Sequence, residues 1–473
     1  MILQRFYHDG LAQASYLVGC AATGEAVIVD PNRDAEAYIA AARAQKLRIT
    51  HVTETHIHAD YLSGLRELCA ATGARPYLSK EGGADWQYAS AGEDKAILLG
   101  NGDVFMVGNI RFEAVHTPGH TPEHLTFLVT DTAGADRPVG AFTGDFIFAG
   151  DVGRPDLLEK AAGVAGTMDA AAAQLYASIT KFKRHPDYLQ LWPGHGAGSA
   201  CGKSLGAMPQ TTLGYERLFN WALADMTEAK FVETVLDGQS DPPTYFAQMK
   251  KLNRAGPHVL KGMPVPAMLP PAQLRSVLEQ GALVVDTRAW SEYAQRHVRG
   301  TVSIPLNRSF VSWAGWILPY DADVYLITAD PSTAQTAARE LALIGIDRVA
   351  GAFTAESVQA ATPDMFREIE QTDVRGMSAA VAERGNTILD VRNMQEWQTG
   401  HVPTDQGARV LHIPLGKLQA RMAEVPREGR LLVHCKSGTR SAIAASILER
   451  NGIAAENVRG GFDAWLAAGF GSD

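Results

Sequence analysis

Histidines and carboxylates recur in short loops of the first half of the chain, beginning with residues 55–64, THIHADYLSG. In this stretch His56, His58 and Asp60 lie two residues apart. Three later loops add further candidates, which are His120 in HTPGHTPEH, Asp145 in FTGDFIF and His195 in WPGHGAG. Neutral imidazole and carboxylate together suit zinc, iron or manganese, so we expect a metal site where these loops meet.

A cysteine near the other end of the chain forms the second candidate site. Cys435 follows the apolar run LLVH, and a short loop leads to a helix that we expect to start near Arg440. Loop amides and a helix N-terminus both stabilise a thiolate or persulfide anion. The expected cradle consists of Lys436, Ser437, Gly438 and Thr439, with Arg440 adding positive charge.

Composition limits the classes of protein that could carry these sites. The 473 residues are 46% apolar and 20% charged, which is ordinary for globular protein, and the net charge is −9. That charge, without a basic run, disfavours nucleic-acid and anionic-membrane partners. No apolar run approaches the ~20 residues that span a bilayer. Residues after Met1 show no secretory signal.

The four cysteines are too scattered for a disulfide framework or a structural zinc site. Cys20 and Cys69 lie in apolar runs and are expected to pack in the core. We therefore expect a reduced, cytoplasmic location.

Four regions must position the two sites. In residues 1–240, β-rich apolar runs alternate with helical stretches, which predicts a layered α/β domain with loops at strand ends. Residues 241–270 hold several prolines and no period, and we expect a surface linker. The remainder is an internal repeat, which predicts two small α/β domains at 271–365 and 374–473.

Alignment of the two repeats shows that the first has lost the chemistry of the second. Ala329 stands where Cys435 stands, and Ala334 where Arg440 stands. The first copy therefore lacks both the nucleophile and the cation, and we expect it to serve packing or docking.

The motifs resemble known families. The order of the histidine loops resembles the metallo-β-lactamase fold over residues 1 to about 240, which implies an αββα sandwich. In two-metal hydrolases of this fold, such as glyoxalase II, counterparts of His56, His58 and His120 hold one metal. Asp60, His195 and a histidine replaced here by Tyr61 would hold the other, with Asp145 bridging. A buried phenol must lose a proton of pKa about 10 to bind metal, so the second site is weakened.

The longer strings THIHADYLSG, GDFIFAGDVGRPDL and WPGHGAGSACGK resemble the persulfide dioxygenases of this fold. That resemblance implies one Fe(II) per chain, held by the two-histidine, one-carboxylate face of His56, His120 and Asp145. The residues expected to surround these ligands are His58, Asp60, Tyr61 and His195. It also implies that a thiol persulfide, of glutathione or coenzyme A type, reacts with O₂ to give sulfite and the free thiol.

The C-terminal copy resembles the rhodaneses. Cys435 and Arg440 are spaced C-x4-R, whereas Cys-based phosphatases use the wider C-x5-R cradle. The resemblance implies that Cys435 carries a sulfane sulfur as a persulfide, while Arg392 and Glu396 are mostly structural. Sulfur would pass between thiosulfate, sulfite and thiol, in a direction that the sequence leaves open.

Two further residues have alternative interpretations. Arg154 in GRPD either holds the carboxylate of a thiol carrier, braces the Asp145 loop, or pairs with Asp151 or Asp156. Cys201 either takes up sulfur near the metal or is a small packing residue.

The combined expectation is an α/β multidomain protein that resembles persulfide dioxygenase–rhodanese fusions and serves sulfide detoxification. A homo-oligomer is expected because the inactive repeat offers a spare surface. Two alternatives stay open: a binuclear zinc thioesterase joined to a sulfurtransferase, and a sulfur-carrier scaffold with a residual metal domain. Metal identity and stoichiometry separate them.

Overall fold

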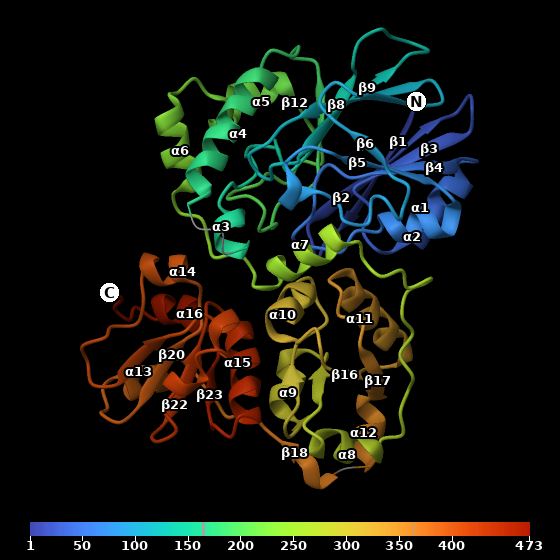
Figure 1. The fold of residues 1–473 in the computed structure, drawn as a ribbon. Coiled ribbons are helices and arrows are strands. Elements are labelled where there is room, and N and C mark those ends of the chain that lie inside the picture. Colours follow the sequence, from blue (N-terminus) through green and yellow to red (C-terminus); the bar gives the residue numbers. More distant parts are fainter. Residues whose placement is uncertain (163–165, 362) are drawn as a thin grey trace. The chain divides into compact units, whose positions relative to one another are not determined.

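The computed structural model describes residues 1–162, 166–361 and 363–473. The chain forms two compact units (Figure 1), one of residues 1–263 with 342–345 and one of residues 264–341 with 346–473. Within the described residues, no helix has both the length and the apolar character to cross a membrane.

Two six-stranded sheets form the centre of the first unit. One sheet has the order β1 (Ile2–His8), β2 (Gln13–Cys20), β3 (Glu25–Val29), β4 (Arg48–Thr53), β5 (Arg75–Ser79) and β6 (Ile97–Leu99). The other has the order β12 (Thr211–Thr212), β11 (Gln190–Pro193), β10 (Gly140–Gly144), β9 (Leu125–Asp131), β8 (Ile110–His116) and β7 (Val104–Val107). Buried side chains of both sheets, such as Val27 and Phe112, share one apolar cluster, so the sheets face each other.

Helices cover the outer faces of these sheets. Tyr38 of α1 (Ala35–Ala44) and Leu68 of α2 (Leu65–Thr72) pack with the first sheet. Leu175 of α4 (Met168–Phe182) and Phe231 of α6 (Glu228–Leu236) pack with the second. The predicted αββα sandwich is confirmed.

Strand direction explains why the candidate ligands meet. β3 runs parallel to β4, and β10 runs parallel to β11, so within each pair the carboxyl ends lie together. His56 follows β4, Asp145 follows β10 and His195 follows β11. His120 lies in the loop from β8 to β9. Glycine permits this packing at Gly153, where a Cβ would overlap the carbonyl oxygen of Asp145.

The segment 241–270, expected to be a linker, contains a helix of the first unit. This helix, α7 (Tyr245–Ala255), buries Tyr245, Phe246, Met249 and Asn253. The prolines that suggested a linker flank the helix, whereas its buried residues recur at the three- and four-residue spacing of one helical face.

The second unit contains two parallel sheets, as the repeat predicted. The first has the order β15 (Val302–Ser303), β13 (Leu283–Asp286), β16 (Val324–Thr328) and β17 (Val349–Thr354). The second has the order β19 (Gln371–Thr372), β23 (Glu456–Val458), β22 (Leu431–His434), β20 (Thr387–Asp390) and β21 (Arg409–His412). In the first copy the loop after β16 leads into helix α11 (Pro331–Leu343). In the second copy the loop after β22 leads into helix α15 (Thr439–Arg450).

Candidate metal centre and sulfur-binding loop

Three of the predicted ligands converge on one buried point. The donor atoms of His56, His120 and Asp145 lie within 4.8 Å of one another. Asp145 Oδ2 is 3.8 Å from His56 Nε2 and 3.4 Å from His120 Nε2. These separations suit three atoms that each lie about 2 Å from one metal ion. Asp145 Oδ2 is buried without a hydrogen-bond partner, so it fits a metal-binding role.

The hydrogen bonds of both imidazoles leave Nε2 free. His120 Nδ1 lies 3.2 Å from the carbonyl oxygen of Arg154 and must donate to it. His56 Nδ1 lies 3.0 Å from Thr55 Oγ1. Burial holds the pKa of His56 well below its ordinary value and lowers that of His120. Both rings are therefore neutral, the form that binds metals.

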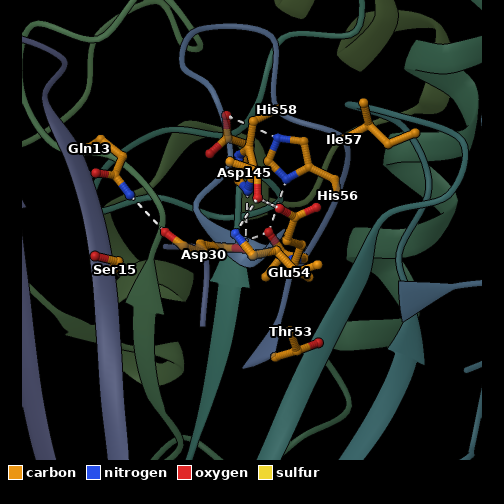
Figure 2. Close-up of polar contacts among 12 residues, drawn as sticks. Gln13, Ser15, Asp30, Thr53, Glu54, His56, Ile57, His58 and Asp145 are labelled. Carbon is orange, nitrogen blue, oxygen red and sulfur yellow. Dashed lines mark hydrogen bonds and ion pairs between the residues drawn. The ribbon is translucent and has the colours of Figure 1, made fainter. Parts of the chain in front are cut away.

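Asp30, which follows β3, orients this loop and was missed by sequence reasoning (Figure 2). Its Oδ1 accepts from the Thr55 backbone N–H at 2.7 Å, and its Oδ2 accepts from Thr55 Oγ1 at 2.9 Å. Because the Thr55 hydroxyl donates to Asp30, its oxygen is left to accept from His56 Nδ1. A lone aspartate after an apolar strand carries no signal of this role.

His58 is held outside the group of three. Its Nε2 lies 3.1 Å from Asp30 Oδ1, and its ring packs at a tilt of 55° against that of His56, with centroids 4.2 Å apart. Burial lowers the pKa of His58, but the charge and hydrogen bond of Asp30 outweigh it and raise the pKa to about 9. The Nδ1 atom is buried without a hydrogen-bond partner.

His195 joins the two carboxylates of the site. Its Nδ1 lies 2.7 Å from Asp145 Oδ1, and its Nε2 lies 2.7 Å from Asp60 Oδ2. Burial lowers the pKa of His195, but the charges of Asp145 and Asp60 outweigh it and raise that pKa well above its ordinary value. With Oδ1 held in this way, Asp145 presents its other oxygen to the two imidazoles.

Tyr61 points away from this centre. Its hydroxyl donates to the backbone carbonyl oxygen of Asp30 at 3.2 Å, and its ring packs on His58. Burial raises the pKa of the phenol well above its ordinary value, so Tyr61 stays protonated. Tyr61 therefore supplies no anionic oxygen to a metal.

A second group of possible ligands includes Cys201, for which the sequence left open a thiol near the metal or a small packing residue. Asp60, His195 and Cys201 bring donor atoms within 4.8 Å of one another, all buried. Burial, followed by the charges of Asp60 and Asp145, raises the pKa of the Cys201 thiol well above its ordinary value. The cysteine lies six residues after His195 in a loop, so chain spacing alone does not show its side chain turning back.

Arg154 takes the structural role among its alternatives. Its Nε and Nη2 donate to the two oxygens of Asp156 at 2.8 and 2.7 Å. The same guanidinium donates to the carbonyl oxygens of Ala200 and Ser240. Burial raises the pKa of Asp156, but Arg154 outweighs it and holds that pKa below its ordinary value. The side chain is buried and engaged, so it braces the loop and is not offered to a carrier carboxylate.

Asn253 of α7 fixes the other side of the metal loop. Its amide nitrogen donates to the carbonyl oxygens of His58 and Tyr61 at 2.8 and 2.7 Å. Its Oδ1 accepts from the Ser63 backbone N–H at 2.9 Å. The expected linker therefore holds the loop that carries His56.

The sulfur of Cys435 lies at the N-terminus of α15. The Gly438 backbone N–H donates to Sγ at 3.1 Å, and Ser441 Oγ lies 3.5 Å from it. Lys436 and Ser437 are exposed and Thr439 is half-buried beside this loop, whereas Cys435 is buried. Ser441 is the contact that sequence reasoning missed, and it lies directly after Arg440.

The predicted cation Arg440 is held by a carboxylate. Its Nη1 and Nη2 donate to the two oxygens of Glu396 at 2.6 and 2.7 Å. Glu396 also completes a capping box with Asn393 at the start of α14 (Met394–Thr399). Arg440 therefore ties α15 to α14, and its charge reaches the sulfur only at longer range.

In the first copy an aspartate accepts from an amide at the start of the corresponding helix, one residue beyond the counterpart of Gly438. Asp330, the counterpart of Lys436, accepts from the Thr333 backbone N–H at 2.9 Å at the start of α11. A carboxylate therefore occupies the helix end that serves sulfur in the second copy.

A second difference concerns the glycine after that loop. Gly461 has a φ of +55°, and a Cβ there would overlap the carbonyl oxygen of Cys435. Its counterpart Ala352 lies within β17. The first copy therefore differs from the second in the backbone as well as in the missing nucleophile.

Comparison with known proteins identifies the family of each of the two site-bearing domains. The metallo-beta-lactamase superfamily model matches residues 8–195, and the rhodanese-like domain model matches residues 374–468. A crystal structure described as a metallo-beta-lactamase from Staphylococcus aureus subsp. aureus COL is 44% identical, with a TM-score of 0.69. The match covers 75% of this chain and 99% of that one. The chain belongs to the metallo-beta-lactamase superfamily. Its C-terminal part is a rhodanese-like domain.

Curated relatives of the metal domain include hydrolases and a persulfide dioxygenase. A hydroxyacylglutathione hydrolase of Rhodospirillum rubrum is 31% identical over 180 residues, 38% of this chain and 60% of that protein. The mitochondrial persulfide dioxygenase ETHE1 of Bos taurus is 29% identical over 206 residues, 41% of this chain and 68% of that protein. The chain spans 60% and 66% of the first two hydrolases that it matches.

Proposed function

We propose that the protein is a non-haem iron persulfide dioxygenase coupled to a sulfurtransferase, acting in sulfide detoxification. The observation that carries the proposal is the set of His56, His120 and Asp145, with one free carboxylate oxygen, in one chain with Cys435 in an anion-stabilising loop. Two neutral imidazoles and one carboxylate are the ligand set of mononuclear Fe(II) oxygenases.

The overall reaction is RSSH + O₂ + H₂O → RSH + SO₃²⁻ + 2H⁺, where RSH is a thiol of glutathione or coenzyme A type. Bound Fe(II) would supply the one-electron chemistry that O₂ needs to react with a persulfide. Thr55 and the Arg154 carbonyl keep the two histidine rings in the metal-binding tautomer. His195 fixes the orientation of Asp145.

Sulfur transfer uses the sulfite of the first reaction. The outer sulfur of the Cys435 persulfide would be attacked by sulfite, its S–S bond would break, and thiosulfate and the Cys435 thiolate would form. The Gly438 amide and the Ser441 hydroxyl are placed to stabilise that thiolate. In the reverse direction, thiosulfate would charge Cys435.

The test measures O₂ uptake by iron-loaded protein with glutathione persulfide and with coenzyme A persulfide. We expect one iron per chain, uptake with at least one persulfide, and sulfite as product. His120→Ala is expected to abolish uptake but keep thiosulfate sulfurtransferase activity, and Cys435→Ser is expected to do the reverse. A fully iron-loaded protein that consumes no O₂ would refute the dioxygenase.

A binuclear zinc thioesterase of the glyoxalase II type is the second candidate, favoured by the group of Asp60, His195 and Cys201. Two zinc ions per chain and hydrolysis of a glutathione thioester would establish it. A sulfur-carrier scaffold would instead purify without metal and show sulfur transfer alone.

A further inference from the structure

Helix α15, whose N-terminus faces the Cys435 sulfur, is buried on all sides. Residues 441–448 are all buried, whereas a helix that lies on a single sheet keeps one face in solvent. Strands β22 and β23 of its own copy contact one side of α15. The other side contacts β15 and α9 (Trp290–Gln295) of the inactive copy.

The contacts with the inactive copy follow one stripe of the helix. They involve Ala445, Ser446, Glu449 and Arg450, which share one helical face because they recur at a spacing of four. Ala445 packs in an apolar cluster with Tyr293 and Ala294 of the inactive copy.

Two hydrogen bonds fix the middle of this stripe. The Ser303 backbone N–H on edge strand β15 donates to Ser446 Oγ at 3.0 Å. His297 Nε2 lies 2.7 Å from Glu449 Oε2. The His297 ring is fully buried and stacks on Tyr293 with centroids 4.2 Å apart, so its orientation is set by the inactive copy.

Arg450 anchors the C-terminal end of the helix. Its Nη1 donates to the carbonyl oxygen of Gly300 at 2.6 Å. Its Nη2 donates to the carbonyl oxygens of Gly281 and Ala282 at 3.0 and 3.2 Å. The planar guanidinium thus binds carbonyls from two loops of the inactive copy, which fixes the helix along its axis.

We propose that the inactive copy is a fixed platform that positions α15, and with it the sulfur-binding loop of Cys435. The inference rests on the sulfur-transfer half of the proposed function. A helix moves largely as a rigid rod, so a shift at Arg450 reaches Gly438, whose N–H contacts the sulfur at 3.1 Å. Because hydrogen bonds weaken steeply with distance and angle, a small shift reduces stabilisation of the thiolate. His297, Glu449 and Arg450 are therefore positioning residues.

The test compares Arg450→Ala and Arg450→Lys in the full chain with a matched control, Arg430→Ala. Arg430 forms an ion pair with Glu456 inside the active copy. The readouts are the rate at which iodoacetamide alkylates Cys435, followed by peptide mass spectrometry, and kcat and KM for sulfur transfer.

For Arg450→Ala we expect alkylation of Cys435 and kcat to fall about tenfold, since the Gly438 N–H loses its hydrogen-bond geometry to the sulfur. Arg450→Lys should recover part of both, and the control should match the wild type. O₂ uptake should stay unchanged in all three variants.

Folded Arg450→Ala with wild-type alkylation and kcat would overturn the platform. If Arg450→Ala fails to fold, Ser446→Ala takes its place, because it removes the acceptor of the Ser303 N–H. Wild-type alkylation of Cys435 in Ser446→Ala would likewise overturn the platform. Alkylation needs no sulfur donor. A wild-type chain without sulfur transfer would therefore defeat the proposed function, while the alkylation rates would still decide on the platform.

Discussion

The Tyr61 hydroxyl donates to the backbone carbonyl oxygen of Asp30 at 3.2 Å. The residue that replaces a ligand histidine of two-metal hydrolases therefore has a structural partner of its own. We predict that Tyr61→His leaves metal stoichiometry at one per chain, because both nitrogens of His195 remain engaged by carboxylates. Metal analysis of the purified variant checks this, with His120→Ala as the metal-poor control. Two metals per chain would show that Tyr61 alone decides the stoichiometry.

Asp30→Asn tests the support beneath His56. Asparagine tolerates the φ of +53° at this position, so the backbone should be kept. The amide offers only one accepting oxygen, whereas the carboxylate now serves Thr55 twice and His58 once. We expect metal affinity to fall about tenfold to hundredfold, measured by competition with a chelator. Unchanged metal affinity would show that Asp30 supports folding but not metal binding.

A double-mutant cycle tests the pairing of Arg440 with Glu396. Arg440→Ala and Glu396→Ala should each slow sulfur transfer, because each removes the tie between α15 and α14. The double variant should be little worse than either single one, with a coupling free energy of about 1 kcal/mol. Steady-state kinetics of thiosulfate sulfurtransferase measure it. Strict additivity would mean that Arg440 acts on the sulfur independently of Glu396.

Glu123 should make stability depend on pH. It is buried beside the metal loop, where its Oε1 accepts from the Ile57 backbone N–H at 2.7 Å, and burial raises its pKa to about 7. The folded state therefore keeps the proton over a range in which the unfolded chain has lost it. The contribution of Glu123 to the free energy of unfolding is on the order of 3 kcal/mol. It is fully present below pH about 4.5 and is lost as the pH rises to about 7.

Glu123→Gln removes this titration and keeps an acceptor for the Ile57 N–H. The free energy of unfolding of the first unit is measured in the full chain by urea denaturation between pH 5 and pH 8. We expect it to vary less with pH in Glu123→Gln than in the wild type. Parallel pH curves for the two proteins would contradict the assignment.

Much of both sites could be predicted because local sequence carried the information. His56, His120 and Asp145 each lie in a glycine-rich loop after an apolar run, and the sandwich gathers such loops at strand ends. Cys435 follows its strand directly, and the loop and helix that surround it are neighbours in sequence. For Cys435, spacing along the chain was a good guide to distance in space. His56, His120 and Asp145 are far apart in sequence, and the family resemblance, not chain spacing, grouped them.

The supporting residues could not be predicted, since their roles depend on contacts far apart in sequence. Asp30 meets His58 across 28 residues, and Asn253 meets the same loop across more than 190. A lone aspartate or asparagine has no pattern that identifies its partner. For Arg440 the local sequence was misleading. Its charge and position suggested a role at the sulfur, but its guanidinium pairs with Glu396, 44 residues earlier in the chain.

The backbone around Ala352 has a consequence for evolution of the first copy. Restoring cysteine at position 329 would not by itself rebuild the loop of the second copy, because Asp330 accepts from the Thr333 N–H at the start of α11 and Ala352 lies in a strand where Gly461 makes a tight turn. Positions 329, 330, 334 and 352 all differ from their counterparts in the second copy, so reversal would involve four positions. A single substitution would therefore not give the first copy the sulfur-binding loop of the second.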